Sequence, residues 1–506
     1  MSPRVGVQRK PGISLASLLQ GYSGTANTPD IAIHGLQQSS DKIEPGDLFC
    51  ALNGHKTHGL RYLSQAVDRG CAAVIYDPLG LPEDFAIPAL EVPICAVSDL
   101  NHFLGYIADR FYGSPSKFMN MLAVTGTNGK SSCSHFLADA LSSHGKAGFI
   151  GTLGWGSRED VRSTTHTTPD AIEIHRILTE LHRAGYQSVV MEASSHGLDQ
   201  ERLNGVRFSG ALFTNFSRDH LDYHQTMEAY LEAKLKLLEW AGLEFVVYNA
   251  DDPIAIPIVA RRRKGLRYLG YGSIDSKQAD EAVRVNYGSI HHHARGTRFT
   301  VHYQAQLANI DVPVFGDFNV ENLTASLAVL LELGYSFESA TVMLGHACPV
   351  PGRMETVSQG GRSAVIDYAH TPDALHSVLT GLRKHCEGNL WVVFGCGGDR
   401  DRGKRAAMGA VADGLADHIV VTDDNPRNED PETIISDIYK GISHRDAIVI
   451  RERNRAIEHA LAYAKRGDLV LVAGKGHETT QEIQGVKYPF SDRDVVMDVL
   501  QNLQQT

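Results

Sequence analysis

Short apolar runs that end in polar, glycine-containing loops recur along the chain, and stretches with helical periodicity separate them. The clearest series lies in the C-terminal part, at 364–366, 390–394, 418–421 and 468–472. Continuous apolar runs of this length, alternating with helices, are typical of buried strands in a parallel sheet. The pattern predicts an α/β fold whose polar loops gather at the carboxyl edge of the sheet, where ligands bind.

One strand-to-helix loop has the composition of a phosphate-binding loop. The apolar run 121–124 leads into the sequence Thr125-Gly126-Thr127-Asn128-Gly129-Lys130-Ser131-Ser132, and a helical pattern follows. Glycines permit a tight turn that points backbone N–H groups and a helix N-terminus at an anion. A lysine and a hydroxyl then serve the outer phosphates and Mg²⁺. The two glycines stand closer together than in the commonest form of this loop, but we still interpret it as a nucleoside triphosphate site.

Length and composition narrow the function classes. A chain of 506 residues is too long for one core, and the pattern restarts twice, which predicts domains 1–98, 99–347 and 348–506. A net charge of −11 argues against nucleic acid as the main partner. No apolar run approaches the roughly 18 residues that would insert into a membrane. Seven cysteines without metal-type spacing, and no signal-peptide core near the N-terminus, predict reduced thiols and a cytoplasmic location.

Several charged side chains are ambiguous on spacing alone. Glu192 ends the apolar run 188–191, where a second Mg²⁺ ligand would sit beside a phosphate loop. His220 lies in a polar loop, where a histidine is more often a hydrogen-bonding residue than a metal ligand. Lys234 and Lys236 fall in the amphipathic run 227–240, and most simply form a solvated helix face.

Two further patterns lie between residues 283 and 331. The segment 283–314 alternates like antiparallel strands, and we expect its run His291-His292-His293 to be an exposed hairpin tip rather than a metal site. The helix that follows carries Asn319 and Asn322, whose spacing places them on one helix face.

Taken in order, the motifs of this chain resemble those of the Mur ligase family. The matching motifs are Thr125-Gly126-Thr127-Asn128-Gly129-Lys130, Thr167-Thr168-Pro169-Asp170, Glu192-Ala193-Ser194-Ser195-His196-Gly197-Leu198, Asp367-Tyr368-Ala369-His370-Thr371-Pro372 and Asp424-Asn425-Pro426-Arg427. The resemblance implies an N-terminal UDP-binding domain, a central P-loop ATPase α/β domain and a C-terminal Rossmann-like domain that takes the amino acid. It also implies an ATP-dependent amide-bond ligase of peptidoglycan synthesis, acting through an acyl phosphate.

The resemblance assigns roles around ATP. By similarity, Glu192 and His220 hold Mg²⁺ together with Ser131, and Lys234 matches a lysine that family members carbamylate with CO₂. An ammonium would repel Mg²⁺, whereas the carbamate could hold it. The ATP-binding residues implied are Gly126, Thr127, Asn128, Gly129, Lys130, Ser131, Ser132, Asn319, Asn322, Arg353 and Asp367. The catalytic residues implied are Lys130, Lys234, Glu192 and His220.

A second group of residues resembles the contacts of UDP-N-acetylmuramoyl-L-alanyl-D-glutamate. The residues implied are Gln38, Ser40, His55, Lys56, Thr57, His166, Thr167, Thr168, Ser194, Gln200 and Arg202. The chain departs from the family where Ser39-Ser40-Asp41 replaces Asp-Ser-Arg, so one arginine of the uridine site is missing. It departs again at His166, which replaces the usual asparagine.

A third group predicts which amino acid is added. In the family, the arginine-bearing motif Asp424-Asn425-Pro426-Arg427 marks use of meso-diaminopimelate, and versions without arginine go with L-lysine. A guanidinium can grip the second carboxylate of diaminopimelate through two hydrogen bonds, but would face the distal cation of lysine. The remaining contacts implied are Arg400, Gly474 and Glu478.

Three other functions compete with this interpretation. A folate or other polyglutamate ligase of the same superfamily would lack the arginine motif and the UDP domain. A P-loop NTPase that moves a partner would turn over ATP without an amino acid, and would leave residues 348–506 unexplained. The glycine-rich turn at 395–398 is a weak dinucleotide signal, because it lacks a third glycine at the required spacing.

Overall fold

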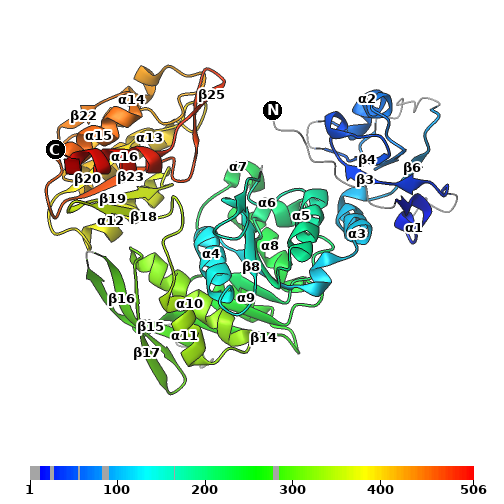
Figure 1. Ribbon diagram of the computed structural model, residues 1–506, viewed down its shortest axis with the longest axis horizontal. Helices are drawn as coiled ribbons and strands as arrows, with labels where there is room; N and C mark the ends of the chain where they lie inside the picture. Colours follow the sequence, from blue (N-terminus) through cyan, green and yellow to red (C-terminus); the bar gives the residue numbers. More distant parts are fainter. Residues whose placement is uncertain are drawn as a thin grey trace. The chain divides into compact units, whose positions relative to one another are not determined.

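The structure of the protein is a computed structural model, which describes residues 12–22, 28–54, 57–81, 90–164, 166–276, 284–293 and 295–505. The chain, whose helices and strands are labelled in Figure 1, forms two compact units. The first comprises residues 1–127, 144–246 and 256–267, and the second comprises 128–143, 247–255 and 268–506. In the described parts of the chain, no helix has the length and apolar character needed to cross a membrane.

The N-terminal part of the first unit is a small parallel sheet. Its strands are β3 (Gly35–Gln37), β4 (Asp47–Ala51), β5 (Ala73–Tyr76) and β6 (Ile94–Ala96), in that order. Strand β4 is buried throughout, as its apolar sequence predicts. Helices α1 (Leu15–Leu19) and α3 (Leu100–Tyr112) share one core with this sheet, and α2 (Leu63–Asp68) follows β4 along the chain.

A second parallel sheet in the first unit carries the start of the phosphate loop. Strand β7 (Asn120–Thr125) lies between β11 (Ser188–Glu192) and β12 (Gly210–Phe213), and β8 (Ala147–Gly151) pairs with β11 on its other side. The edge strands β9 (Gly154–Gly156) and β10 (Val161–Arg162) are antiparallel. Helices α5 (Ala171–Arg183), α6 (Ser195–Asp199), α7 (Leu221–His224) and α8 (Met227–Leu235) follow in chain order, and the last runs into a 3₁₀ turn, Lys236–Glu239.

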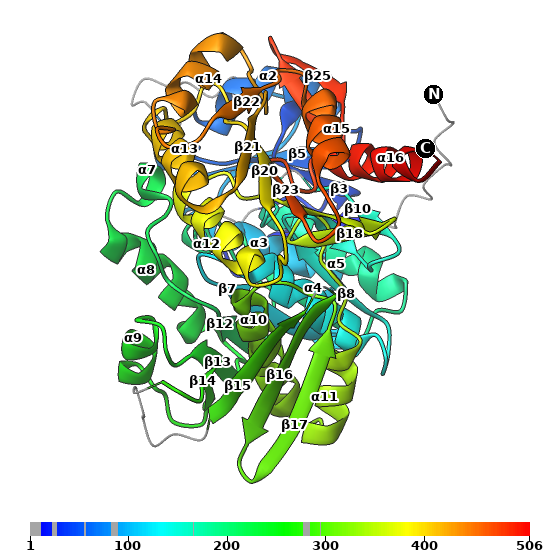
Figure 2. The ribbon, with the colours of Figure 1, turned by 90° about the vertical axis from the view of Figure 1, so that its left-hand side faces the viewer.

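The second unit begins with helix α4 (Lys130–Leu141), which leads out of the phosphate loop and packs against α10 (Asp317–Glu332). Strand β13 (Phe245–Asn249) and helix α9 (Ala255–Ala260) both cross the unit boundaries. Strand β14 (Arg267–Ser273) runs parallel to β15 (Arg284–His293), and β15, β16 (Gly296–Tyr303) and β17 (Gln306–Val312) form an antiparallel ribbon, seen in both Figure 1 and Figure 2. Helix α10 lies against β15 and helix α11 (Phe337–Gly345) against β17.

The C-terminal sheet has the predicted parallel strands. The order is β18 (Glu355–Gln359), β19 (Arg362–Asp367), β23 (Leu469–Ala473), β20 (Leu390–Phe394), β21 (His418–Val421) and β22 (Ala447–Val449), with only β18 antiparallel. Helices α12 (Pro372–Arg383), α13 (Gly403–Leu415) and α14 (Pro431–Tyr439) pack on one face. Helices α15 (Arg453–Tyr463) and α16 (Asp492–Gln505) pack on the other, so the strands are covered on both sides. This arrangement confirms the predicted α/β class.

Two features differ from expectation. The hairpin β24 (Thr480–Ile483) and β25 (Val486–Pro489) was not predicted, although it lies beside the motif at 424–427. The histidine run is not simply an exposed hairpin tip. His292 is 14% exposed, and its Nε2 lies 3.0 Å from Asp317 Oδ1. The prediction was wrong for this residue because its strand packs near α10 and the turn after α12, where His385 lies against the His292 ring.

Candidate active site

The first half of the phosphate loop is fixed by contacts within the first unit. Gly126 follows β7 with φ of +148°, and a Cβ there would lie 1.9 Å from Thr214 Oγ1, so only glycine fits. The hydroxyl of Thr127 donates to the Ser217 carbonyl (3.2 Å) and accepts from the Ser217 N–H (3.0 Å). The loop is therefore anchored to the chain that follows β12.

Lys234 lies directly beside this loop. Its side chain is buried, its Nζ donates to the carbonyl of Gly126 (2.8 Å), and it sits 4.5 Å from the ring centre of Tyr230. Burial raises the pKa of Tyr230 to about 12, against the lowering effect of a hydrogen bond between its hydroxyl and that of Thr127 (3.1 Å). The expectation of a solvated lysine face is wrong for Lys234, because α8 turns this side toward the loop. It is right for Lys236, which is exposed and pairs with Asp199.

Glu192 ends strand β11, at the carboxyl edge of the sheet that carries the phosphate loop. It is buried, and its two carboxylate oxygens accept hydrogen bonds from the N–H (3.0 Å) and hydroxyl (3.1 Å) of Thr152. Gly151 makes room for it, because a Cβ there would lie 2.0 Å from Glu192 Oε1. The carboxylate is thus held in one orientation by its neighbours.

His220 immediately precedes α7 with φ of +53°, a left-handed conformation that costs a non-glycine residue energy and often marks a functional position. Its ring lies edge-on to His196 (4.8 Å between centroids) and to Tyr230 (5.9 Å). Because Lys234 also contacts Tyr230, the lysine and this histidine share one neighbourhood.

These residues suit Mg²⁺ only in part as they stand. In the described chain, no group of three or more histidine, cysteine or acidic side chains has metal-binding geometry. Mg²⁺ prefers oxygen ligands, and usually takes one or two carboxylates together with substrate phosphates and water. Glu192 supplies one carboxylate. A carbamate on Lys234 would supply a second, so the donor set fits the ion once that lysine is modified.

The predicted muramoyl-dipeptide residues come together around Thr168. Its hydroxyl lies within hydrogen-bond distance of Ser194 Oγ (2.9 Å) and donates to the Glu192 carbonyl (2.8 Å), while its own carbonyl accepts from Arg202 Nη1 (2.8 Å). Arg202 also contacts Gln200 (2.9 Å). Two further members of the set, Thr167 and His166, precede Thr168: the Thr167 hydroxyl lies 3.0 Å from that of Thr152, and His166 is exposed.

The N-terminal members of that set are more scattered. Gln38 Nε2 donates to Asp170 Oδ1 (3.2 Å), which ties the N-terminal sheet to the start of α5. The Ser40 hydroxyl donates to Gln65 (2.7 Å), and Thr57 is half-buried. His55 and Lys56 lie outside the described residues.

In the second unit, the predicted adenine-side residues meet the rest of the phosphate loop. Gly129 precedes α4 with φ of +85°, and a Cβ there would lie 2.5 Å from Asn322 Oδ1. The Asn322 amide donates to Asn319 Oδ1 (3.3 Å), so the two asparagines share a helix face as predicted. Glu321 lies between them in sequence, and burial raises its pKa to about 7. Asn128 is exposed, Lys130 is half-buried, and Ser131 and Ser132 are buried in the first turn of α4.

Arg353 and Asp367 form a separate cluster in the same unit. Asp367 accepts from the N–H groups of Met354 and Ala369, both at 2.8 Å, and burial raises its pKa against the lowering effect of Arg353. The Arg353 guanidinium lies 4.7 Å from the ring centre of Tyr368. The carbonyl of Asp367 accepts from the Gly474 N–H (3.0 Å), which connects this cluster with the predicted amino-acid site.

The predicted amino-acid residues converge at the carboxyl ends of β20, β21 and β23. Arg427 Nη1 donates to the Gly398 carbonyl (2.8 Å), and a Cβ on Gly397 would touch both Arg427 and Arg400. Asn425 Nδ2 donates to Glu478 Oε2 (2.9 Å). The rest of the set is adjacent: Pro426 lies against Gly398, and Asp424 lies against Gly474.

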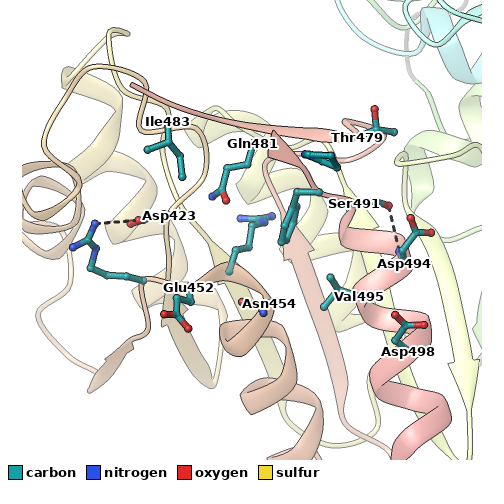
Figure 3. Close-up of a pocket in the computed structure, with 14 residues that line it drawn as sticks. Asp423, Glu452, Asn454, Thr479, Gln481, Ile483, Ser491, Asp494, Val495 and Asp498 are labelled. Atoms are coloured by element: carbon teal, nitrogen blue, oxygen red, sulfur yellow. Dashed lines mark hydrogen bonds and ion pairs between the residues drawn. The ribbon is translucent and has the colours of Figure 1, made fainter. Parts of the chain in front are cut away.

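A cavity of about 910 Å³ is lined by the hairpin β24–β25 and by helices α15 and α16 (Figure 3). Gln481 and Ile483 reach into it from β24, and Asp494, Val495 and Asp498 from α16. None of the predicted site residues lines it. It borders the site through Gln481, whose Nε2 donates to the Asp424 carbonyl (2.7 Å), and through Asp423 and Ile483, which adjoin Asp424 and Arg427.

Sequence reasoning missed the residues that hold the site in place. Tyr230, Thr152, Lys475 and Glu482 carry no recognisable motif role, because their importance comes from contacts with residues far away in sequence. One signal was available for Lys475, which stands inside the polar loop that ends β23.

Three models of known protein families match most of the chain. The model "Mur ligase family, catalytic domain" matches residues 32–112, "Mur ligase middle domain" matches 124–330, and "Mur ligase, glutamate ligase domain" matches 352–476. The chain is 45% identical to the UDP-N-acetylmuramoyl-L-alanyl-D-glutamate–2,6-diaminopimelate ligase of Alkalilimnicola ehrlichii, over 96% of this chain and 98% of that protein. It is 44% identical to the ligase of the same name from Coxiella burnetii, over 95% and 98%.

Several solved structures also align with most of the chain. A structure of UDP-N-acetylmuramoyl-L-alanyl-D-glutamate–2,6-diaminopimelate ligase aligns with a TM-score of 0.70 at 35% identity, covering 98% of this chain and all of that one. MurF from Acinetobacter baumannii aligns at 0.66 and 19% identity, which shows a shared fold alone. A folylpolyglutamate synthase from Thermotoga maritima aligns at 0.58 and covers only 73% of this chain.

Proposed function

Because this chain belongs to the Mur ligase family, we infer that it catalyses the reaction for which its full-length relatives are named. It is an ATP-dependent ligase that joins meso-diaminopimelate to UDP-N-acetylmuramoyl-L-alanyl-D-glutamate, a step of peptidoglycan synthesis. ATP, the dipeptide nucleotide and the diamino acid are its small-molecule substrates. The relatives match nearly end to end, so the reaction is assigned to the whole chain.

One observation supports the choice of diaminopimelate above all others. Arg427 stands at the strand ends with its Nη1 bonded to the Gly398 carbonyl and its Nε 3.4 Å from Glu482 Oε2. Its remaining N–H groups can grip a carboxylate, and Glu478 nearby can receive an ammonium. L-lysine would place a cation against this arginine and leave it without an anionic partner, which disfavours lysine.

The chemistry requires an activated carboxylate. A carboxylate oxygen of the dipeptide attacks the γ-phosphorus of ATP, so that ADP leaves and an acyl phosphate forms. The amine of diaminopimelate then attacks the acyl carbon, phosphate leaves, and the nitrogen loses a proton to give the amide. Anionic groups repel one another throughout, so charge neutralisation and positioning provide most of the rate enhancement.

We propose that this chain's residues divide that work as follows. The loop 126–132 binds the triphosphate, with Lys130 offsetting the charge of its outer phosphates, and Asn319 and Asn322 lie on the adenine side. Arg353 and Asp367 approach ATP from the C-terminal domain. Thr167, Thr168, Ser194, Gln200 and Arg202 orient the dipeptide, while Gln38, Ser40, His55, Lys56, Thr57 and His166 serve the nucleotide sugar.

We propose that Ser131, Glu192, His220 and carbamylated Lys234 hold Mg²⁺, which when bound would shield the charge on the transferred phosphoryl group. Burial of Lys234 against the Gly126 carbonyl supports this role, because burying a lysine side chain costs free energy that an exposed lysine avoids. Mass spectrometry of enzyme equilibrated with bicarbonate should find one CO₂ added at Lys234. Absence of the adduct at saturating bicarbonate would refute the carbamate without affecting the reaction assignment.

Domain and compartment assignments are also proposals. The boundaries 1–98, 99–347 and 348–506 divide the chain into UDP-binding, ATP-binding and amino-acid-binding domains. All seven cysteines are free thiols, which agrees with the proposed cytoplasmic reaction.

The reaction is tested by phosphate release from ATP in the presence of the dipeptide nucleotide. Assays contain meso-diaminopimelate, L-lysine or no amine, and boiled enzyme is the control. We expect release with diaminopimelate only. Release with lysine but not diaminopimelate would overturn the specificity, and release that needs no amine would indicate an NTPase of another kind.

A further inference from the structure

The side-chain amide of Asn425 is held by two donors at once. Lys475 Nζ lies 3.1 Å from Asn425 Oδ1, and the backbone N–H of Glu482 lies 2.9 Å from the same atom. A lysine ammonium and a backbone N–H can only donate. The atom that both contact must therefore be the amide oxygen, which settles the orientation of this asparagine.

The orientation decides what Asn425 offers to a ligand. With its oxygen turned toward Lys475, the amide presents its nitrogen to the remaining surroundings, and one N–H of that nitrogen already binds Glu478 Oε2 (2.9 Å). Its second N–H is the atom these contacts leave available. A donor at this position favours a carboxylate and disfavours an ammonium, whereas the flipped amide would do the opposite.

Lys475 is buried and its ammonium is held by contacts within the site. It is fully buried, and its ammonium also pairs with Glu478 Oε2 at 3.0 Å, which offsets the cost of burying the charge. Its Nζ therefore contacts two residues of the predicted amino-acid site, Asn425 and Glu478. The carboxylate of Glu478 keeps a second oxygen outside these contacts, which can accept from an amine.

We propose that Lys475 is the positioning residue that sets the hydrogen-bonding polarity of the amino-acid site. It turns Asn425 so that a donor faces the incoming carboxylate, and it holds Glu478 so that an acceptor faces the incoming ammonium. Lys475 itself does not contact substrate. The inference rests on the proposed function, because it assumes that the site receives a diamino dicarboxylic acid.

The test compares Lys475→Met with Lys465→Met, a matched control at an exposed position of the same region. In Lys475→Met the KM for meso-diaminopimelate should rise about tenfold or more, the scale expected for losing a charged hydrogen bond. The KM values for ATP and the dipeptide nucleotide should stay within about twofold, and selectivity for diaminopimelate over L-lysine should fall about tenfold. Lys475→Arg, which keeps a cationic donor, should recover part of the loss.

The outcomes separate two failures. Wild-type enzyme that ignores meso-diaminopimelate would refute the proposed function. Active wild-type enzyme together with a folded Lys475→Met variant of unchanged KM and selectivity would refute the role of Lys475 alone. If Lys475→Met does not fold, Asn425→Asp is used instead, since it keeps an acceptor for Lys475 but removes the N–H. An unchanged KM for diaminopimelate in that variant would also refute the proposal.

Discussion

Buried cations are held differently in the C-terminal sheet and beside the phosphate loop. In the C-terminal sheet they pair with carboxylates: Arg405 with Glu429 (2.7 Å), Arg453 with Asp492 (2.7 Å), and Lys475 with Glu478 (3.0 Å). Beside the phosphate loop, the contacts described for Lys234 include a backbone carbonyl and an aromatic ring.

The contacts described for these cations differ in what they require of the charge. A buried ammonium or guanidinium that faces a carboxylate must stay charged, because losing either charge leaves the other without compensation. A carbonyl oxygen can accept from an ammonium and also from the N–H of a carbamate. We therefore expect the C-terminal pairs to control stability and positioning, and Lys234 to control the chemical step.

The largest effect should come from Lys234→Met. Removing the group proposed to become a metal ligand should lower kcat about 10³-fold, or about 4 kcal/mol in the activation free energy, while the melting temperature changes little. Lys264→Met, at an exposed position of the same unit, is the control and should stay within about twofold of wild type. Activity of Lys234→Met close to that of wild type would contradict the expectation that Lys234 controls the chemical step.

Arg453→Met should show the opposite behaviour. Its guanidinium is fully buried, and bonds both oxygens of Asp492 and the Ala473 carbonyl, so its removal leaves a buried carboxylate unpaired. We expect a loss of about 3–4 kcal/mol in the free energy of unfolding, measured by urea denaturation. The exposed ion pair of Arg455 with Glu452 is the matched control, and Arg455→Met should cost no more than about 0.5 kcal/mol. Equal losses in the two variants would show that the buried pair is not special.

Arg427→Ala tests whether the C-terminal region also sets specificity. Loss of a bidentate carboxylate contact should lower kcat/KM for meso-diaminopimelate about 100-fold, or about 2.7 kcal/mol, and leave the KM for ATP unchanged. Arg427→Lys should recover little, because an ammonium cannot reproduce the planar grip. A variant that keeps its preference for diaminopimelate would locate specificity elsewhere.

The smallest effect concerns two partly buried carboxylates, one in each region, whose pKa values shift in opposite directions. Arg405 lowers the pKa of Glu429 to about 2, whereas burial raises the pKa of Glu321 to about 7. Between the ordinary glutamate pKa and pH 7, folded protein keeps a Glu321 proton that the unfolded chain has released. Stability should therefore fall as the pH rises through that window, by about 1.4 kcal/mol for each pH unit. Glu321→Gln should abolish this part of the pH dependence, with chemical denaturation at pH 5 and pH 8 as the measurement.

Local patterns accounted for the strands and the motif-bearing loops. The apolar runs at 121–124, 188–191 and 390–394 became β7, β11 and β20, because a buried parallel strand needs a continuous apolar sequence. The motif residues Asn319 and Asn322 share a face because helical periodicity alone fixes their spacing. The order of the C-terminal strands did not follow from local patterns, since β23 inserts between β19 and β20 although it comes last of the three in sequence.

The supporting contacts could not be read from the sequence for the same reason. Burial of Lys234 depends on Tyr230 and the Gly126 carbonyl, and an amphipathic helix with lysines usually presents them to solvent. The hairpin β24–β25 has short strands with exposed apolar residues, such as Val486 and Tyr488, so no alternation marked it as part of a site. The hairpin contributes to the site through its backbone hydrogen bonds with Arg427.

That pairing has a consequence for anyone who would retarget the enzyme. Arg427 adopts a φ of +53°, and the hairpin β24–β25 holds it on both sides, through the Glu482 carbonyl of β24 (3.1 Å) and the N–H of Gln484 in the turn (2.7 Å). A bulky residue pays for such a conformation wherever neighbours do not enforce it. If residues 424–427 alone were replaced by those of a ligase with another specificity, the hairpin of this protein would still impose its own backbone conformation on the new residue 427. The motif and its hairpin form a single cassette that has to be exchanged together.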